Sequence, residues 1–116
     1  MAAFVKGDVV VVPFPFSDLS TAKRRPALVL ASLEGDDIIL CQVTSRMIKD
    51  SYSIQIDDSS FKTGGLQQTS NIRPNKIFTA DSNIVLYSAG TLKQDMMLSV
   101  TQRVIDILTN SSLVNE

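Results

Sequence analysis

Three consecutive cations stand immediately before an apolar stretch in the first quarter of the chain. Lys23, Arg24 and Arg25 are followed by Pro26 and then by an unbroken apolar run. Neighbouring like charges repel one another, and burial of the apolar run gains nothing from them. An external anion would resolve this conflict, because arginine presents a planar fork of donors to anionic oxygens. The segment therefore predicts an anion-binding site at the start of a buried strand, although a solvated basic loop is the alternative.

Two absences restrict the other chemistry. The chain has no histidine and a single cysteine, Cys41, so an internal disulfide is impossible. Histidine is the commonest general acid or base and the commonest metal ligand. The acidic pairs at 36–37 and 57–58 are typical of turns. We therefore expect no metal and no cofactor, and a reaction that uses arginine, lysine, hydroxyl or carboxylate side chains.

Length and composition indicate a single globular domain over residues 1–116. Hydrophobic residues make up 44% of the chain and charged residues 20%, and the net charge is −1. These values fit a folded protein rather than a disordered one. The apolar runs have the length of strands, so no membrane span is expected, and the first residues lack the pattern of a secretory signal. Together with the lone cysteine, this favours the cytoplasm.

A β-hairpin is the element that would position the basic triplet. The apolar stretches at 26–33 and 38–44 predict two buried strands, and residues 34–37 predict the turn between them, with Gly35 able to adopt a positive φ. Arg25 precedes the first of these strands, and Thr44 ends the second. Counting symmetrically about the turn places both residues at the same end of the hairpin.

The remaining segments complete a small antiparallel barrel. Four valines at 9–12 predict a strand, and Pro13 and Pro15 either end its pairing or confine it to a sheet edge. Apolar residues at helical spacing predict a helix over 94–108. Weaker expectations are a polar loop at 17–23, a short strand at 52–56 and a turn or loop at 62–70. A further strand is expected at 71–80, interrupted or edge-like at Pro74, and the segment at 83–92 fits either a helical turn or a strand.

Three blocks of the chain resemble the MazF/PemK-like toxin family. They are GDVVVVPFPFSDLSTAKRRPALVL at 7–30, CQVTSR at 41–46 and GLQQTSNIRPNKIFTA at 65–80. With the final helix, the resemblance extends over nearly the whole chain. It departs from many members in two places: valines replace aromatic residues in the first strand, and Phe78 stands where an arginine is common.

The resemblance implies both a fold and an activity. The fold is an SH3-like, CcdB/PemK-type barrel with a C-terminal helix, acting as a homodimer. The activity is that of a type II toxin: metal-independent, sequence-selective cleavage of single-stranded RNA, inhibited by an antitoxin with an acidic disordered C-terminal segment. Carried over by position, the catalytic residues are Arg25 and Thr44. Around these two positions, we expect the RNA-binding residues to be Phe16, Asp18, Lys23, Arg24, Gln42, Ser45 and Arg46.

The implied chemistry suits these side chains. When a ribose hydroxyl attacks the neighbouring phosphorus, negative charge builds on the phosphate oxygens. Arg25 would stabilise that charge, Thr44 would donate its hydroxyl proton to the same oxygens, and Lys23 and Arg24 would steer the RNA. The proton acceptor stays open between Asp18, the backbone and solvent.

Two other functions remain as alternatives at this point. One is a toxin of the same barrel type that poisons DNA gyrase by protein contact. The C-terminal residues lack the bulky aromatic end that such a contact would use. The other is an inactive barrel that binds an acidic peptide. Thr44 alone also fits ordinary β-propensity at a strand end.

Overall fold

The computed structural model describes residues 4–15 and 22–110 of the chain. Seven strands, two short 3-10 helices and one α-helix are formed by these residues. In chain order they are β1 (Asp8–Pro15), β2 (Ala22–Ser32), β3 (Asp37–Thr44), β4 (Ile54–Ile56), η1 (Asp58–Ser60), β5 (Phe61–Gly64), β6 (Ser70–Asp81), η2 (Ser82–Ile84), β7 (Tyr87–Leu92) and α1 (Gln94–Asn110).

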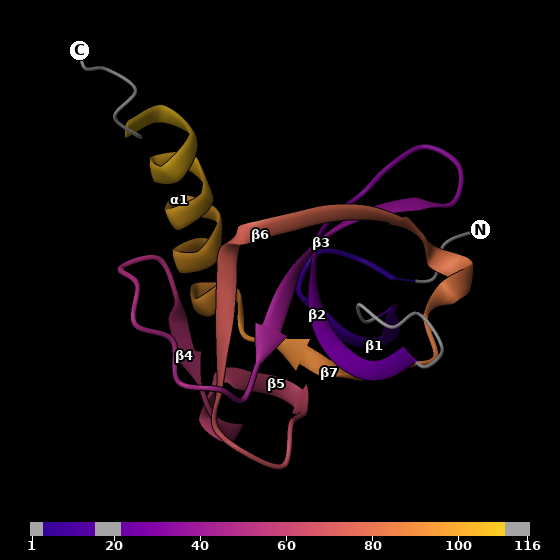
Figure 1. The fold of residues 1–116 in the computed structure, drawn as a ribbon, viewed down its shortest axis with the longest axis horizontal. Coiled ribbons are helices and arrows are strands. Elements are labelled where there is room, and N and C mark those ends of the chain that lie inside the picture. Colours follow the sequence, from indigo (N-terminus) through magenta and orange to yellow (C-terminus); the bar gives the residue numbers. More distant parts are fainter. Residues whose placement is uncertain (1–3, 16–21, 111–116) are drawn as a thin grey trace.

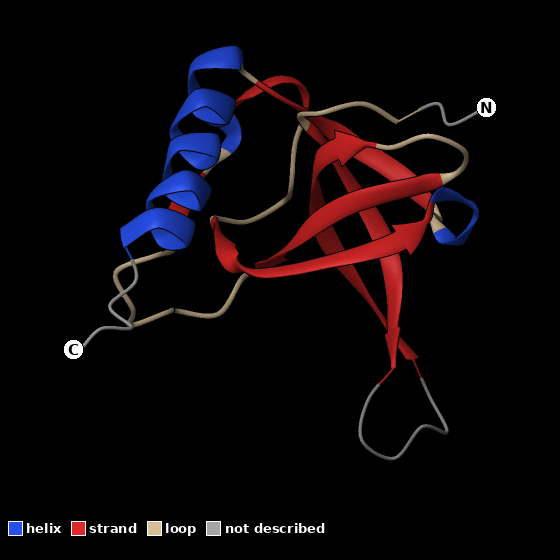
Figure 2. Ribbon diagram, turned by 90° about the horizontal axis from the view of Figure 1, so that it is seen from above, coloured by secondary structure: helices blue, strands red, loops and turns tan. Residues whose placement is uncertain are grey.

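All seven strands belong to one antiparallel sheet. Its order is β4-β6-β3-β2-β1-β7-β5, so β2 and β3 form the centre of a sheet that curls into a half-barrel (Figure 1). The helix α1 lies to one side of this barrel (Figure 2). The predicted class, mainly β with one C-terminal helix, is confirmed. Among the described residues, no helix has the length and apolarity that a bilayer crossing requires.

The curled sheet buries apolar side chains on both of its faces. Val9 belongs to the cluster beneath α1, which includes Leu28 and Val100. The alternate residues Val10 and Val12 belong to a second cluster inside the barrel. Because successive side chains of a strand point to opposite faces, a strand that is buried on both faces must be apolar throughout. This explains the uninterrupted valine run.

The basic triplet lies within a strand rather than before one. β2 starts at Ala22, and Lys23, Arg24 and Arg25 pair with Phe14, Pro13 and Val12 of β1, respectively. The expectation that Lys23 belongs to a polar loop is therefore wrong, because β1 continues through its prolines and gives the triplet a partner strand. Ala22 also belongs to β2, and residues 17–21 of the predicted loop lie outside the described residues.

The prolines of β1 are accommodated at an open edge. β7 pairs with β1 only as far as Val11, whose carbonyl accepts a hydrogen bond from Leu86. Alternate residues of a strand direct their backbone polar groups to the same side, so the backbone nitrogens of Pro13 and Pro15 face the side on which β7 pairs with Val11. Since β7 does not extend that far, the missing N–H groups lie on an uncovered edge. The prediction that proline confines this strand to an edge is confirmed for its second half.

The later segments differ in detail from the predictions. The predicted turn or loop at 62–70 overlaps two strands, because β5 extends from Phe61 to Gly64 and β6 begins at Ser70. The pair Gly64–Gly65 favoured a turn over a strand in the sequence. The ambiguous segment at 83–92 contains both structures, since η2 is followed by β7. The predicted strand at 71–80 is confirmed as β6, and its register against β3 shifts opposite Pro74.

Cys41 is fully buried in the cluster beneath α1. Desolvation raises the pKa of its thiol to about 12. Since the thiolate is the reactive form, we expect Cys41 to resist a disulfide reagent such as DTNB at neutral pH in the folded protein. One thiol per chain should react after denaturation. Rapid modification under native conditions would contradict this burial.

Candidate active site

Arg25 and Thr44 come from adjacent central strands. The β2–β3 register pairs Ala27 with Gln42, and continuing it by two residues places Arg25 opposite Thr44. Opposed residues of neighbouring strands lie on the same face of the sheet. Both residues line the same two cavities, of about 610 and 470 Å³. The structure thus brings together the two residues on which the sequence prediction rests.

The first cavity, of about 610 Å³, has a largely uncharged lining. Arg24 and Arg25 are the only ionisable Lys, Arg, Asp or Glu side chains among its described lining residues. Amide and hydroxyl groups line the rest of its polar surface, from Ser45, Gln67, Gln68, Ser70, Tyr87 and Ser88. Such groups both donate and accept hydrogen bonds, so this cavity suits a neutral polar ligand group beside an anion.

The second cavity, of about 470 Å³, is strongly basic. Arg25, Arg46 and Arg73 line it, and no carboxylate is present among its described lining residues. Its apolar wall is formed by Phe14, Met47 and Ile48. Arg73 also forms an ion pair of 3.5 Å with Asp50, which is absent from the lining, so the lining itself remains positively charged. The cavity therefore suits a ligand with more than one negative charge.

The hydroxyl of Thr44 is oriented by the chain that follows it. Thr44 is 8% exposed, and its Oγ1 accepts a hydrogen bond of 3.1 Å from the backbone N–H of Arg46. Because this contact uses an oxygen lone pair, the hydroxyl proton remains available for donation to a ligand. The arrangement makes Thr44 a hydrogen-bond donor toward the cavities.

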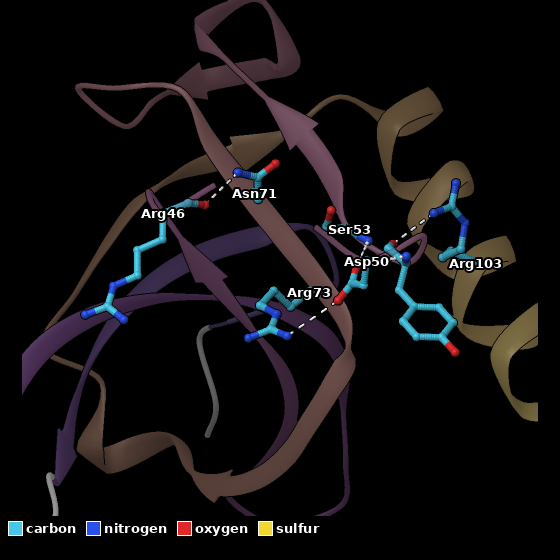
Figure 3. A network of polar contacts seen from close by, with 7 residues as sticks. Arg46, Asp50, Ser53, Asn71, Arg73 and Arg103 are labelled. Carbon is cyan, nitrogen blue, oxygen red and sulfur yellow. Dashed lines mark hydrogen bonds and ion pairs between the residues drawn. The ribbon is translucent and has the colours of Figure 1, made fainter. Parts of the chain in front are cut away.

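Residues 45–53, the β3–β4 loop, are held by a polar network (Figure 3). Asp50 accepts hydrogen bonds of 3.0 Å from the N–H groups of Tyr52 and Ser53, and it lies 3.5 Å from Arg73 Nη2. Burial raises the pKa of Asp50, but these three partners more than offset it and lower the pKa below its usual value. Asp50 therefore stays ionised at neutral pH, and its contacts weaken only as the pH falls through that lowered pKa.

The structure places the other predicted site residues as follows. Arg24 and Ser45 line the first cavity, and Gln42 and Arg46 line the second. Lys23 is exposed on β2 and is absent from the lining of both. Phe16 and Asp18 lie outside the described residues, so the proposed proton acceptor Asp18 has no described position.

Sequence reasoning missed Arg73 as a site residue. Arg73 pairs with Gln42 across the β3–β6 register shift and lines the second cavity. Its Nε is buried without a hydrogen-bond partner among the described residues. The only feature of the sequence that could have indicated a role for Arg73 is its place as a basic residue in the family-like block at 65–80. Within the described part of the chain, no three His, Cys, Asp or Glu side chains are grouped so as to bind a metal ion.

Comparison with solved structures finds similar folds at low sequence identity. One is a mycobacterial endoribonuclease in complex with its cognate antitoxin, with a TM-score of 0.74, 12% identity, and coverage of 95% of this chain and 99% of that one. The MazE–MazF crystal structure from Deinococcus radiodurans gives a TM-score of 0.68 and 19% identity, with coverage of 94% of this chain and 98% of that one. The Mycobacterium tuberculosis toxin MazF-mt6 gives a TM-score of 0.64 and 14% identity, with coverage of 85% of this chain and 95% of that one.

Sequence comparisons give one positive result. No curated protein matches the chain in sequence. In contrast, the family model for the PemK-like, MazF-like toxin of type II toxin–antitoxin systems matches residues 5–108, which include every described strand and nearly all of α1. With this match and the half-barrel fold in agreement, the chain belongs to the PemK-like, MazF-like family of type II toxins.

Proposed function

We propose that this chain is a metal-independent endoribonuclease that cleaves single-stranded RNA as the toxin of a toxin–antitoxin pair. The observation that carries the proposal is that Arg25 and Thr44 line the same two cavities. Family membership supports the toxin role. The likeness in fold to a mycobacterial endoribonuclease supports the reaction class.

The reaction would proceed without a covalent enzyme intermediate. The ribose 2′-oxygen attacks the adjacent phosphorus, the bond from phosphorus to the 5′-oxygen breaks, and a 2′,3′-cyclic phosphate and a 5′-hydroxyl result. The 2′-hydroxyl loses its proton to solvent or a protein base, and the leaving oxygen gains one. Arg25 stabilises the charge on the phosphate oxygens, while the Thr44 hydroxyl donates a hydrogen bond to one of them.

The two cavities would divide the substrate between them. A ribonucleotide combines a neutral base, which offers hydrogen-bonding edges, with a charged phosphate. The amide and hydroxyl groups of the first cavity suit a base, and the three arginines of the second suit the backbone. Phe78, at the position where many family members carry arginine, packs edge to face on Phe14 at 5.3 Å. Sequence selectivity would then depend on the first cavity.

We expect the purified protein to cleave unstructured RNA in the presence of EDTA. The products should carry a 2′,3′-cyclic phosphate, because the nucleophile is the ribose hydroxyl rather than water. Cleavage is measured by primer extension on a long RNA. The cyclic phosphate ends should resist a phosphatase that removes only phosphomonoesters, and the 5′-hydroxyl ends should accept phosphate from polynucleotide kinase without prior dephosphorylation. A matched oligodeoxynucleotide, which lacks the nucleophile, is the control. RNA that stays intact across varied sequences would overturn the proposal.

The basic cavity also suits the proposed antitoxin. An acidic disordered segment would place its carboxylates where the RNA phosphates bind, because both ligands satisfy the same guanidinium groups. The toxin would act in the cytoplasm as a homodimer. Competition between an acidic antitoxin peptide and RNA would support a shared site, whereas simultaneous binding would contradict it.

A further inference from the structure

The position of the Arg46 peptide group decides where the Thr44 hydroxyl points. Thr44 is the last residue of β3, and its Oγ1 accepts the hydrogen bond of Arg46 N–H from the β3–β4 loop. A shift of this loop would release the hydroxyl from that contact. The direction of its proton therefore depends on whatever holds the loop.

Asn71 holds the near end of the loop. It lies opposite Thr44 in the β3–β6 register, and its Nδ2 donates a hydrogen bond of 2.9 Å to the carbonyl oxygen of Arg46. The Arg46 backbone is thus bound on both sides, by Thr44 at its N–H and by Asn71 at its carbonyl. In Figure 3 the Arg46 side chain extends away from this contact.

Arg103 holds the far end of the loop from a distant element. It lies on α1, and its Nη1 donates hydrogen bonds of 2.9 Å to the carbonyl oxygens of both Ser51 and Tyr52. Figure 3 shows Arg103 reaching from the helix to the loop. Hydrogen bonds from a charged donor are stronger than neutral ones. The loop is therefore fixed to β6 at its start and to α1 at its end.

We propose that Asn71 and Arg103 are positioning residues that orient the Thr44 hydroxyl through the β3–β4 loop. This inference rests on the proposed endoribonuclease function. Neither residue lines the two cavities that Arg25 and Thr44 share. Both residues would act on the reaction through the backbone of Arg46. Their substitution should therefore lower kcat, and it should do so only when Thr44 is present.

A double-mutant cycle separates positioning from a general loss of structure. Asn71→Ala and Arg103→Ala are each made in the wild-type and Thr44→Ala backgrounds, and kcat and KM are measured with one RNA oligonucleotide. We expect kcat to fall about tenfold in the wild-type background, because misdirection of a reacting group is costly. In the Thr44→Ala background the same changes should have less than about a threefold effect. Equal losses in both backgrounds would overturn the inference.

Two matched variants control the helix substitution. Gln102→Ala removes a neighbouring side chain of α1 whose amide binds Asp106 rather than the loop, so its kcat should stay unchanged. Arg103→Lys retains a positive donor and should recover part of the lost rate. No recovery with lysine, or a Gln102→Ala loss equal to that of Arg103→Ala, would argue against the contact with the loop.

Amide hydrogen exchange tests, without any RNA, whether Asn71 and Arg103 hold the β3–β4 loop. We expect Asn71→Ala and Arg103→Ala to accelerate exchange of the Arg46 amide about tenfold, with global unfolding measured in parallel as the control. Unchanged Arg46 exchange would overturn the inference even if RNA is cleaved. If the wild-type protein cleaves no RNA, the proposed function fails, while accelerated exchange would still show that the two residues hold Arg46.

Discussion

Arg25→Ala is expected to lower the rate of RNA cleavage by about 100- to 1,000-fold, which is the usual loss when one charge-stabilising donor is removed from such a site. Arg25 is the residue that lines both cavities from β2, facing Thr44 of β3. No remaining side chain of β2 can replace it, because Arg24 lines only the first cavity. The measurement is the single-turnover rate at saturating RNA.

Two variants control this result. Arg25→Lys retains the charge but loses the planar fork, so we expect a rate between those of the wild type and Arg25→Ala. Arg24→Ala removes a neighbouring cation, so it should weaken RNA binding with a smaller change in the saturated rate. Cleavage by Arg25→Ala at the wild-type rate, with circular dichroism showing the same fold, would remove Arg25 from the mechanism.

Gly90→Ala is expected to destabilise the protein by about 3 kcal/mol or more, at the upper end of the usual cost of overpacking. A Cβ at Gly90 would lie 2.4 Å from the carbonyl oxygen of Thr63 and 2.9 Å from the backbone nitrogen of Gly65. Both are backbone atoms of the β5 region, so relief requires β5 to move away from β7. The free energy of unfolding, from urea denaturation, measures the effect.

Gly35→Ala provides the comparison for this substitution. Gly35 has φ +72°, and a Cβ there meets no atom within 4 Å. Its cost is limited to backbone strain of about 1–2 kcal/mol. Gly90→Ala should therefore be the more destabilising of the two. If Gly35→Ala unfolds more readily, steric contact between β5 and β7 is not what restricts residue 90.

The hairpin could be predicted from the sequence because its determinants are local. Gly35 marks the turn, and the apolar stretches on either side have the length of buried strands, so counting outward from the turn places Arg25 and Thr44 at one end. Their roles in catalysis stay predictions. The start of β2 could not be placed in the same way, since it depends on how far β1 continues through Pro13 and Pro15.

The rest of the candidate site depends on contacts between distant segments. Arg73 lines the second cavity beside the register shift between β3 and β6. Pro74 predicts an interruption of the strand, but it does not predict which residue of β3 lies opposite Arg73. Arg103 donates hydrogen bonds to Ser51 and Tyr52, which precede it in the chain by 52 and 51 positions. Helical periodicity predicts that α1 forms, but it does not reveal which loop the polar side of the helix meets.

The two prolines of β1 also limit how copies of this chain can associate. Beyond Val11, the open edge of β1 lacks hydrogen-bond donors at residues 13 and 15, so an incoming strand would find carbonyl groups but no N–H groups there. Strand addition along this stretch, the usual first step toward β-aggregates, is thereby disfavoured.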